Sequence, residues 1–536
     1  MVKKIVPGTL LTLLLIIIVT LPCNMQLIKA ESRNIIATYG EGYLEDINGL
    51  PILHLKGSPY EMGYQNGFLL KDSIEAYIQY QIQQMVDMGY SYEYRVTCAQ
   101  AMEPHIPQEY IEEMQGLADG ASMNYTDVLL VQLDGNIIFY GPGWTGCSGF
   151  AVFGNATGDG HLHHGRSLDA ISLLPPGEPV GLVTVCEPES GNAFVNVGWF
   201  GFIGVLTGMN KEGITVANKV SSSTDQTLDG MPVEFMLREV LQYCSNLTQA
   251  IDIICQTDRT VGWNIVLGDG KNLNACVIET SANYSKVFWA GDPAENIEPH
   301  YSIPNAARRT NHYVDSELAA TQRDPYDPRG AWDWSWDRYE KLSQLIEDNY
   351  GNIDAEMSIE FLRTPPVAWY PINFQSTVFD STDLELWVAN ANSTTPAYLR
   401  EFIHLSYDDL FSPYTPDIPD APEGCFVATA TYGTPMTEEI QILREFRDKY
   451  LLTNPIGQAF ADFYYKFSPP IAEFITEHPS LKPIVRAGLV PAVVMSTVVV
   501  NSTVSEKMVI LGLLVLVSVV VAVSATRRRG RGPEYT

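Results

Sequence analysis

The sequence predicts an α+β fold in which antiparallel β-sheets are covered by layers of helices. Three features indicate this fold. The front of the chain, up to about residue 139, carries helical patterns, and from Cys147 onward short apolar segments are joined by turns that contain Gly, Asp or Asn. Such segments are typical of strands paired in hairpins. Further helical patterns are grouped between the hairpins, as expected when helices cover sheets.

The front of the chain is expected to form three helices. Ser58-Pro59-Tyr60-Glu61 is a capping-box pattern with proline at the first helical position, and it predicts a helix over about 59–88. Two more helical stretches follow at 108–117 and 126–139.

The middle of the chain is expected to form successive hairpins. The four predicted turns are Gly158-Asp159-Gly160, Ser190-Gly191-Asn192, Lys211-Glu212-Gly213 and Asp269-Gly270-Lys271. Two helices are expected within 231–256 and another over 336–350.

The composition excludes two classes of protein. Among 536 residues, 33 Lys and Arg stand against 63 Asp and Glu, for a net charge of −30. This argues against nucleic acid as a partner, because phosphate contacts are made by clustered Lys and Arg. Hydrophobic residues make up 46% of the chain, enough for a full core, so wholesale disorder is excluded as well. The chain is also too long for one average domain.

The two ends of the chain predict its compartment. Lys3 and Lys4 precede an apolar run and a small residue at Ala30, so 1–30 is interpreted as a secretory signal peptide, with an N-terminal anchor as the alternative. The uncharged run 508–525 would span about 27 Å as a helix at roughly 1.5 Å per residue. The arginines that follow it predict a cytoplasmic tail over 526–536 and an extracellular location for residues 31 to about 504.

The predicted exterior carries glycosylation sequons and cysteines. The six Asn-x-Ser/Thr sequons begin at Asn124, Asn155, Asn246, Asn283, Asn392 and Asn501, which is consistent with a glycoprotein. Seven cysteines remain once Cys23 is assigned to the signal peptide, and an odd number implies at least one unpaired thiol. The sequence leaves open whether the other six pair or are buried free thiols.

The candidate chemistry is concentrated around Cys147. Trp144-Thr145-Gly146-Cys147-Ser148-Gly149-Phe150 places this thiol at the head of the first strand of a hairpin, and His164-Gly165-Arg166-Ser167-Leu168-Asp169 ends the partner strand. The hairpin should bring Arg166 and Asp169 back beside Cys147. There a guanidinium can stabilise a thiolate and a carboxylate can hold an ammonium group.

These two segments resemble motifs of the penicillin acyltransferase type of N-terminal-nucleophile hydrolases, which are relatives of choloylglycine hydrolases and acid ceramidase. The resemblance extends over roughly residues 50–405, where further motifs follow in the same order. Leu55 to Gly67 is similar to the family's amino-terminal signature, with Asn66 where a histidine is common. The other matching segments are Gly146-Cys147, His164 to Asp169, Gly208 to Gly213, Trp263-Asn264 with Glu279, Arg309-Thr310-Asn311-His312, and Ser335-Trp336-Asp337-Arg338.

The resemblance implies a four-layer αββα sandwich made as an inactive precursor. Cleavage between Gly146 and Cys147 would be autocatalytic and would leave an α chain, 31–146, associated with a β chain that begins at Cys147. The freed α-amine would be the general base, since an ordinary α-amine titrates at roughly 7.7–8.0. No cofactor is implied.

The resemblance also implies roles for individual residues. Cys147 would be the nucleophile towards a small N-acyl or amide substrate, with Arg166 beside it. Asp169 would orient the amine, and Asn264 would hydrogen-bond the oxyanion. The residues expected to bind substrate are Asn218, Asn311, His312 and Arg338. Water or an acceptor amine would then resolve the acyl enzyme.

Each residue also has a purely structural interpretation. Arg166 and Asp169 could form an ion pair without a catalytic role, Asn264 could be a turn-side amide, and Asn311-His312 could cap a loop. His161, His163 and His164 suggest zinc, but alternation along a strand would turn His164 away from the other two. With no clear carboxylate or cysteine partner in the sequence, we predict no metal site.

The predicted organisation is a signal peptide at 1–30 and a hydrolase domain at 31–411, whose part 147–411 starts the β chain. A Pro-rich linker (412–424), a CFI-box-like juxtamembrane module (425–504) and a transmembrane helix (508–525) follow. The CFI-box resemblance rests on Cys425-Phe426-Val427-Ala428-Thr429-Ala430-Thr431-Tyr432-Gly433. The function this favours is a surface-anchored amidohydrolase or acyltransferase in the cell membrane. The alternative is a non-catalytic surface structural or binding protein built on the same fold.

Overall fold

The structure, a computed structural model, describes residues 34–140, 146–169, 181–323, 332–368 and 373–412, and scattered positions between 442 and 497. The chain divides into two units, Met1–Asn34 and Ile35–Thr536. Several predicted segments lie outside the described residues. These are the signal peptide, the transmembrane run, the cytoplasmic tail, residues 141–145 before Gly146, and most of the CFI-box-like module.

The chain begins its described part with three strands that the sequence analysis did not predict: β1 (Asn34–Tyr39), β2 (Gly42–Ile47) and β3 (Leu50–Gly57). The predicted capping box follows. Ser58 accepts a hydrogen bond from the backbone of Glu61, whose side chain accepts from the backbone of Ser58 in return. The helix start that the sequence indicated is therefore confirmed.

The single helix expected over 59–88 is wrong, because the chain forms two helices, α2 (Pro59–Leu69) and α3 (Lys71–Asp87). Leu70 between them leaves the helical conformation, with φ −118° and ψ 18°. The reason is the packing of α2, whose Gly63 and Gly67 lie against the backbone of α5 (Gln108–Ala121) so closely that a Cβ would come within about 2 Å of a carbonyl oxygen there. This contact fixes the direction of α2 and leaves α3 to turn onto other partners.

The rest of the front is helical, as predicted, with one helix more than expected. The front also contains α4 (Tyr92–Met102), η1 (Glu103–His105) and α6 (Tyr125–Tyr140). The unexpected α4 is joined to α6 by a buried ion pair, in which Arg95 donates two hydrogen bonds to Asp134 at 2.9 and 2.6 Å.

The larger sheet has ten strands in the order β1-β2-β3-β6-β7-β8-β9-β10-β11-β12. Its later members are β6 (Gly181–Pro188), β7 (Phe194–Trp199), β8 (Thr207–Asn210), β9 (Ile214–Val220), β10 (Trp263–Asp269), β11 (Asn274–Thr280) and β12 (Ser285–Trp289). β3 pairs with β6 in parallel, which requires a long connection, and here residues 58–180 supply it with the front helices and a hairpin of the other sheet. The pairings from β6 to β12 are antiparallel.

The smaller sheet has six antiparallel strands in the order β13-β4-β5-β14-β15-β16. These are β4 (Gly146–Val152), β5 (His163–Asp169), β13 (Ala306–Arg309), β14 (Asn373–Asp380), β15 (Glu385–Asn390) and β16 (Ile403–Ser406). The predicted hairpin of β4 and β5 is confirmed, with Cys147 opposite Leu168 and Gly146 opposite Asp169. The other three predicted turns also lie where they were expected, between consecutive strands of the larger sheet.

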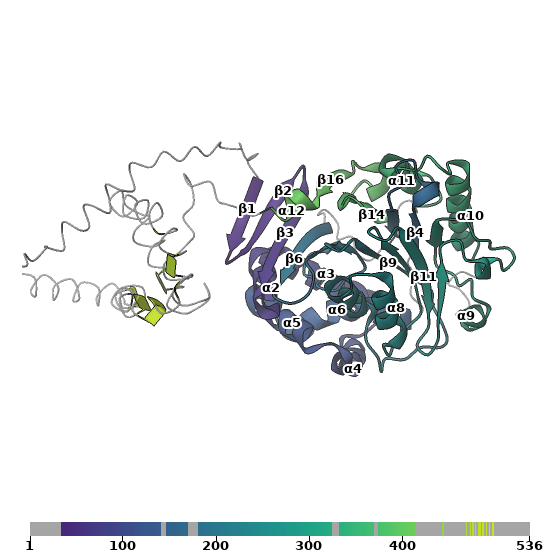
Figure 1. Cartoon of the computed structure of the whole chain (residues 1–536). Coiled ribbons are helices and arrows are strands. Elements are labelled where there is room, and N and C mark those ends of the chain that lie inside the picture. Colours follow the sequence, from purple (N-terminus) through teal and green to yellow (C-terminus); the bar gives the residue numbers. More distant parts are fainter. Residues whose placement is uncertain are drawn as a thin grey trace, which may run out of the picture. The chain divides into compact units, whose positions relative to one another are not determined.

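Helices cover the two sheets (Figure 1). The front helices, α7 (Val233–Tyr243) and α8 (Leu247–Gln256) share one apolar core with the larger sheet. α10 (Trp332–Asp348) and α11 (Ala355–Arg363) share another with the smaller sheet, and β4 and β10 contribute Ala151 and Val266 to a third core. Two short helices, α9 (Ser316–Thr321) and α12 (Tyr407–Leu410), complete the set. The prediction of a mixed fold built of large sheets and helices is confirmed.

One finding concerns the predicted membrane location. No helix in the described part of the chain is long and apolar enough to cross a membrane.

The described cysteines are all free thiols, namely Cys98, Cys147, Cys186, Cys244, Cys255 and Cys276. Cys425 lies outside the described ranges.

Candidate functional site

The thiol of Cys147 lies in a buried, positively charged environment. Cys147 is the second residue of β4, and only 3% of its surface is exposed. The Arg166 guanidinium on β5 approaches its Sγ at 3.7 Å. Burial lowers the pKa of Arg166, while the thiol and Asp169 act in the opposite direction. The hairpin therefore brings Arg166 to Cys147, as predicted.

The backbone of Cys147 is held on both sides by residues from distant segments. Its N–H donates to Asn311 Oδ1 at 2.8 Å, and its carbonyl oxygen accepts a hydrogen bond from Arg338 Nη1. Arg338 Nη2 also donates to Asn311 Oδ1 at 2.8 Å, and Nη1 donates to Ser148 Oγ at 3.1 Å. Asn311 Nδ2 in turn donates to the Val220 carbonyl at 2.8 Å. Asn311 and Arg338, which were expected to bind substrate, thus contact the backbone of Cys147 itself.

Asp169 lies opposite Gly146, the residue before Cys147, and is fully buried. Its Oδ1 accepts hydrogen bonds from Ser167 Oγ and from Asn373 Nδ2, both at 2.9 Å. Burial lowers the pKa of Arg338, while the negative charges of Asp169 and of a Cys147 thiolate act in the opposite direction. The predicted carboxylate is therefore part of the cluster. Asn373, which helps to hold it, carries no local sequence signal and was not predicted.

The Asn264 side chain contacts the loop that carries Asn311. Its Nδ2 donates to the carbonyl oxygens of Thr310 at 3.1 Å and His312 at 2.8 Å, on either side of Asn311. A primary amide has two N–H hydrogens, and both are used here. In this structure the Asn264 side chain fixes the loop that carries Asn311, and its role as the oxyanion donor stays a prediction.

Asn218 offers a second candidate donor. Its Oδ1 accepts from Arg166 Nη2 at 3.2 Å, so its amide lies beside the group that contacts Sγ. Its Nδ2 is buried and has no hydrogen-bond partner among the residues that the structure describes. Buried donors are seldom left unpaired, so an unpaired one this close to the Cys147 thiol is a candidate for binding a substrate oxygen.

His312 is a structural support of the Asn311 loop. Burial lowers the pKa of its imidazole well below the ordinary value, and His300, Arg309 and Arg338 act in the same direction. Its Nδ1 lies 2.6 Å from Ser335 Oγ, which accepts the backbone N–H of Asn311 at 2.9 Å. A neutral His312 therefore positions Ser335, and Ser335 positions Asn311.

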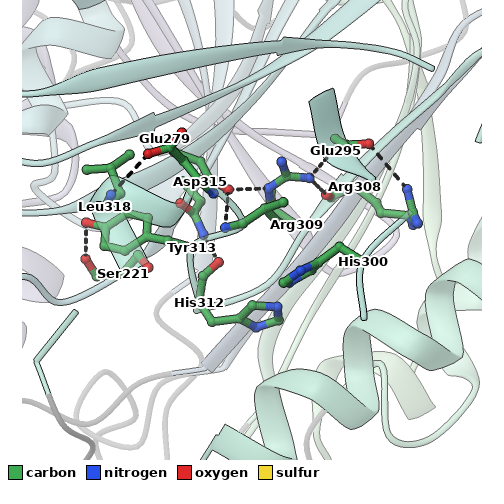
Figure 2. Close-up of polar contacts among 12 residues, drawn as sticks. Ser221, Glu279, Glu295, His300, Arg308, Arg309, His312, Tyr313, Asp315 and Leu318 are labelled. Carbon is green, nitrogen blue, oxygen red and sulfur yellow. Dashed lines mark hydrogen bonds and ion pairs between the residues drawn. The ribbon is translucent and has the colours of Figure 1, made fainter. Parts of the chain in front are cut away.

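A buried ion-pair network holds the same loop from the other side (Figure 2). Arg309 Nε donates to Glu279 Oε1 at 2.7 Å, and its Nη1 donates to Glu295. Glu279 also accepts the backbone N–H groups of Val314 and Asp315 at 2.8 and 2.9 Å. Although burial opposes its charge, Glu295 and Glu279 raise the pKa of Arg309 above its ordinary value. Both ends of segment 310–313 are thereby anchored to β11.

Lys219 is a further buried group near the thiol that the sequence analysis missed. It is fully buried on β9, and its Nζ donates to the Ala217 carbonyl at 3.0 Å. A Cβ on Gly149 would come within 2.3 Å of Nζ, so glycine at that position makes room for the lysine. Burial lowers the pKa of Lys219 well below its ordinary value, which favours the neutral amine.

Comparison with known proteins identifies the chain's relatives. A family model described as acyl-coenzyme A:6-aminopenicillanic acid acyl-transferase matches residues 176–388. An uncharacterised protein of Archaeoglobus fulgidus is 30% identical over 440 residues, which cover 72% of this chain and 70% of that protein. The chain belongs to the penicillin acyltransferase family. The resemblance inferred from its motifs is confirmed. The matched region contains Asn218, Asn264, Asn311 and Arg338 and begins downstream of Cys147.

This penicillin acyltransferase family member has other relatives. The proteins dcd1A and dcd1B of Dictyostelium discoideum are 25% and 24% identical, covering 70% and 69% of this chain and 89% and 77% of their own lengths. Among solved structures, a Caenorhabditis elegans N-acylethanolamine-hydrolyzing acid amidase ortholog matches with 18% identity and a TM-score of 0.33, over 44% of this chain and 93% of its own. A mutant conjugated bile acid hydrolase from Clostridium perfringens matches with 14% identity and a TM-score of 0.31, over 50% and 95%.

Proposed function

We propose that this protein is a surface-anchored cysteine amidohydrolase or acyltransferase that acts on the C–N bond of linear N-acyl substrates and that activates itself by cleavage before Cys147. The observation that carries the proposal is that three polar side chains from different segments converge on Cys147. Arg166 contacts its sulfur, Asn311 its backbone nitrogen and Arg338 its carbonyl oxygen. A buried structural cysteine has no need for this set of partners.

Activation would use the same thiol as turnover, before the α-amine exists. Cys147 Sγ attacks the Gly146 carbonyl carbon, the C–N bond breaks, the thiol proton passes to the departing nitrogen, and the Gly146 acyl group moves from nitrogen to sulfur as a thioester. Water then hydrolyses the thioester, which yields a Gly146 carboxylate, restores the thiol and leaves a free α-amine on Cys147. The Asn311 oxygen that accepts the peptide N–H is in place to accept from this amine afterwards.

In turnover the α-amine takes the thiol proton, and the thiolate attacks the substrate carbonyl carbon. The negative charge that develops on the substrate oxygen is stabilised by Asn218 Nδ2 and by the nearby guanidinium of Arg166. The protonated amine then gives its proton to the leaving nitrogen, and the acyl group stays on sulfur. Water as acceptor completes hydrolysis, whereas an amine as acceptor completes acyl transfer.

Asp169 and the Asn311 loop are assigned to positioning. Asp169 balances the charges of Arg166 and Arg338 close to the amine. Asn264, Ser335 and His312 keep Asn311 in place, so they act on the reaction through Asn311.

A pair of cysteine variants tests the proposal. Cys147→Ala should stay uncut and lose amine release from a panel of N-acyl substrates, whereas Cys147→Ser keeps an attacking oxygen and should be cut slowly. Cys98→Ala is the matched control, because Cys98 is a free thiol of the same 3% exposure. It should be processed like the wild type. Terminal sequencing that finds no new end at Cys147 in the wild type, or full amidase activity in Cys147→Ala, would overturn the assignment and favour the non-catalytic alternative.

The proposed location has a separate test. If 1–30 is removed on secretion and 508–525 spans the membrane, protease added to intact cells should release the folded domain. Complete protection in intact cells, with cleavage after lysis, would place the domain on the other side of the membrane without affecting the catalytic proposal.

A further inference from the structure

Two turns at the end of the smaller sheet far from Cys147 bring histidines and aspartates together. The β4–β5 turn supplies Asp159 and His161, and His163 begins β5. The β14–β15 connection supplies Asp380, the last residue of β14, and Asp383. His163 and Asp380 are direct neighbours across the strand pair, at the opposite end of the hairpin from Cys147. Besides the local Asp159, two carboxylates therefore come from a segment about 220 residues away.

The distances between possible ligand atoms fit a small divalent cation. His161 Nδ1 lies 2.9 Å from Asp380 Oδ2 and 3.8 Å from Asp383 Oδ2, and His163 Nε2 lies 3.0 Å from Asp159 Oδ2. Asp159, His163 and Asp380 form one group with ligand atoms within 4.8 Å of one another, and His161, Asp380 and Asp383 form a second. Neighbouring ligands at the metal distances of a tetrahedral zinc site are about 3.3–3.6 Å apart, so little movement would be needed.

The carboxylates are held in place and lack a permanent cation. Asp380 Oδ1 accepts the backbone N–H groups of Thr382 and Asp383 at 3.0 and 3.1 Å, and Asp159 Oδ1 accepts that of His161 at 2.9 Å. Asp380 is only 5% exposed. Their ion-pair partners in the described part of the chain are histidines, with no lysine or arginine among them. A buried carboxylate between two others is costly unless a positive charge balances it.

We propose that these turns bind one divalent transition-metal ion of the zinc class, with Asp380 as the ligand common to both groups, His161 and His163 as nitrogen ligands, and Asp159 and Asp383 as the flanking carboxylates. Imidazole together with carboxylate is a donor set that suits zinc. His163 is buried and turns its Nε2 towards this cluster, 3.0 Å from Asp159 Oδ2.

The role of the ion is structural. The two turns are already joined by two hydrogen bonds, from Ser381 N to the Leu162 carbonyl at 3.0 Å and from Leu162 N to Thr382 Oγ1 at 2.9 Å. A metal ion adds a stronger link at the same place and so ties β4 and β5 to β14 and β15. The competing interpretation is a pair of metal-free His–Asp hydrogen bonds.

The experiment uses the full chain without a histidine tag, in a Cys147→Ala background that removes the reactive thiol as a zinc ligand. After treatment with a chelator and dialysis, the protein is titrated calorimetrically with zinc, manganese, calcium and magnesium chlorides, and its thermal unfolding is followed at each zinc concentration. We expect saturable binding of one zinc ion per chain and a melting temperature that rises with zinc. Asp380→Asn should weaken zinc binding at least about 100-fold.

His105→Gln is the matched control. His105 makes a single hydrogen-bonded pair with Asp229 at 2.7 Å and belongs to neither three-ligand group, so its loss should leave zinc binding unchanged. If Asp380→Asn does not fold, Asp383→Asn and His161→Gln change more exposed ligands and should each weaken binding at least 10-fold. Failure of the wild type to bind zinc saturably, binding of calcium or magnesium in preference to zinc, or zinc binding unchanged in these variants would overturn the proposal.

Discussion

The side-chain oxygen of Asn311 accepts the backbone N–H of Cys147 at 2.8 Å, although the two residues are 164 positions apart. In the intact chain this nitrogen belongs to the peptide bond after Gly146. In the cleaved protein it would be the α-amine that acts as general base. In the proposed mechanism, this one hydrogen bond would serve both the precursor and the cleaved enzyme.

Replacing Asn311 should separate binding from chemistry. Asn311→Leu keeps the size of the side chain but removes the acceptor for the Cys147 nitrogen and the donor to Val220. We expect precursor cleavage and kcat each to fall about 100-fold while KM changes little, because the lost contact orients the base. Asn349→Leu is the matched control, because this half-buried side chain just after α10 also donates to a backbone carbonyl, that of Leu345 at 2.8 Å, and the variant should keep the wild-type kcat. A wild-type kcat in Asn311→Leu would contradict the role of Asn311.

The oxyanion donor is tested by comparing Asn218 with Asn264. Asn218→Asp keeps the oxygen that accepts from Arg166 but loses the Nδ2 donor, so kcat should fall about 10²- to 10³-fold. Asn264→Leu leaves the carbonyls of Thr310 and His312 without their donor and should lower the free energy of unfolding by about 2 kcal/mol. Steady-state kinetics and urea unfolding measure the two effects. An Asn218→Asp variant with normal kcat, beside an inactive Asn264→Leu of normal stability, would restore Asn264 as the donor.

The ion pair of Glu279 and Arg309 should stabilise the fold. Glu279→Gln leaves the Arg309 guanidinium with reduced compensation in a fully buried site, and we expect the free energy of unfolding to fall by about 3 kcal/mol. The exposed pair of Glu360 and Arg363 provides the control, since Glu360→Gln should cost less than about 0.5 kcal/mol. Urea unfolding in the uncut Cys147→Ala background measures both. Equal effects of the two variants would show that burial does not strengthen the Glu279 pair.

The pH dependence of stability should report on Glu234. Burial raises the pKa of this carboxyl from its ordinary 4.5 to about 7, while Asn136 acts in the opposite direction as a donor to both carboxylate oxygens. The folded protein therefore binds a proton that the unfolded chain releases between about pH 4.5 and 7. The stabilisation of the folded state by this bound proton is fully present below pH 4.5 and is lost as the pH rises to about 7. Glu234→Gln should remove the dependence.

The measurement is the free energy of unfolding of wild type and Glu234→Gln from pH 4.5 to 8. The stability of the variant relative to the wild type should increase by on the order of 3 kcal/mol across this range. Parallel curves for the two proteins would contradict a raised pKa for Glu234.

Much of the local structure followed from local sequence signals. The capping box at Ser58 and the turns at Gly158-Asp159-Gly160 and Asp269-Gly270-Lys271 lie where they were predicted, because each depends on residues within one turn. The hairpin that pairs Cys147 with Leu168 followed in the same way, and with it the approach of Arg166 to the thiol. The break of the first helix at Leu70 did not follow, since it depends on how closely α2 packs against α5.

The sequence by itself determined the family, the nucleophile candidate and the hairpin that carries it, because periodicity, turn residues and ordered motifs are all readable along the chain. Only the tertiary structure decided which asparagine touches Cys147, that Asn264 holds a loop, and that Asp380 stands beside His161 and His163. These relationships join segments separated by tens to hundreds of residues. Such contacts depend on strand order, register and the packing of the two sheets, and no local pattern encodes them.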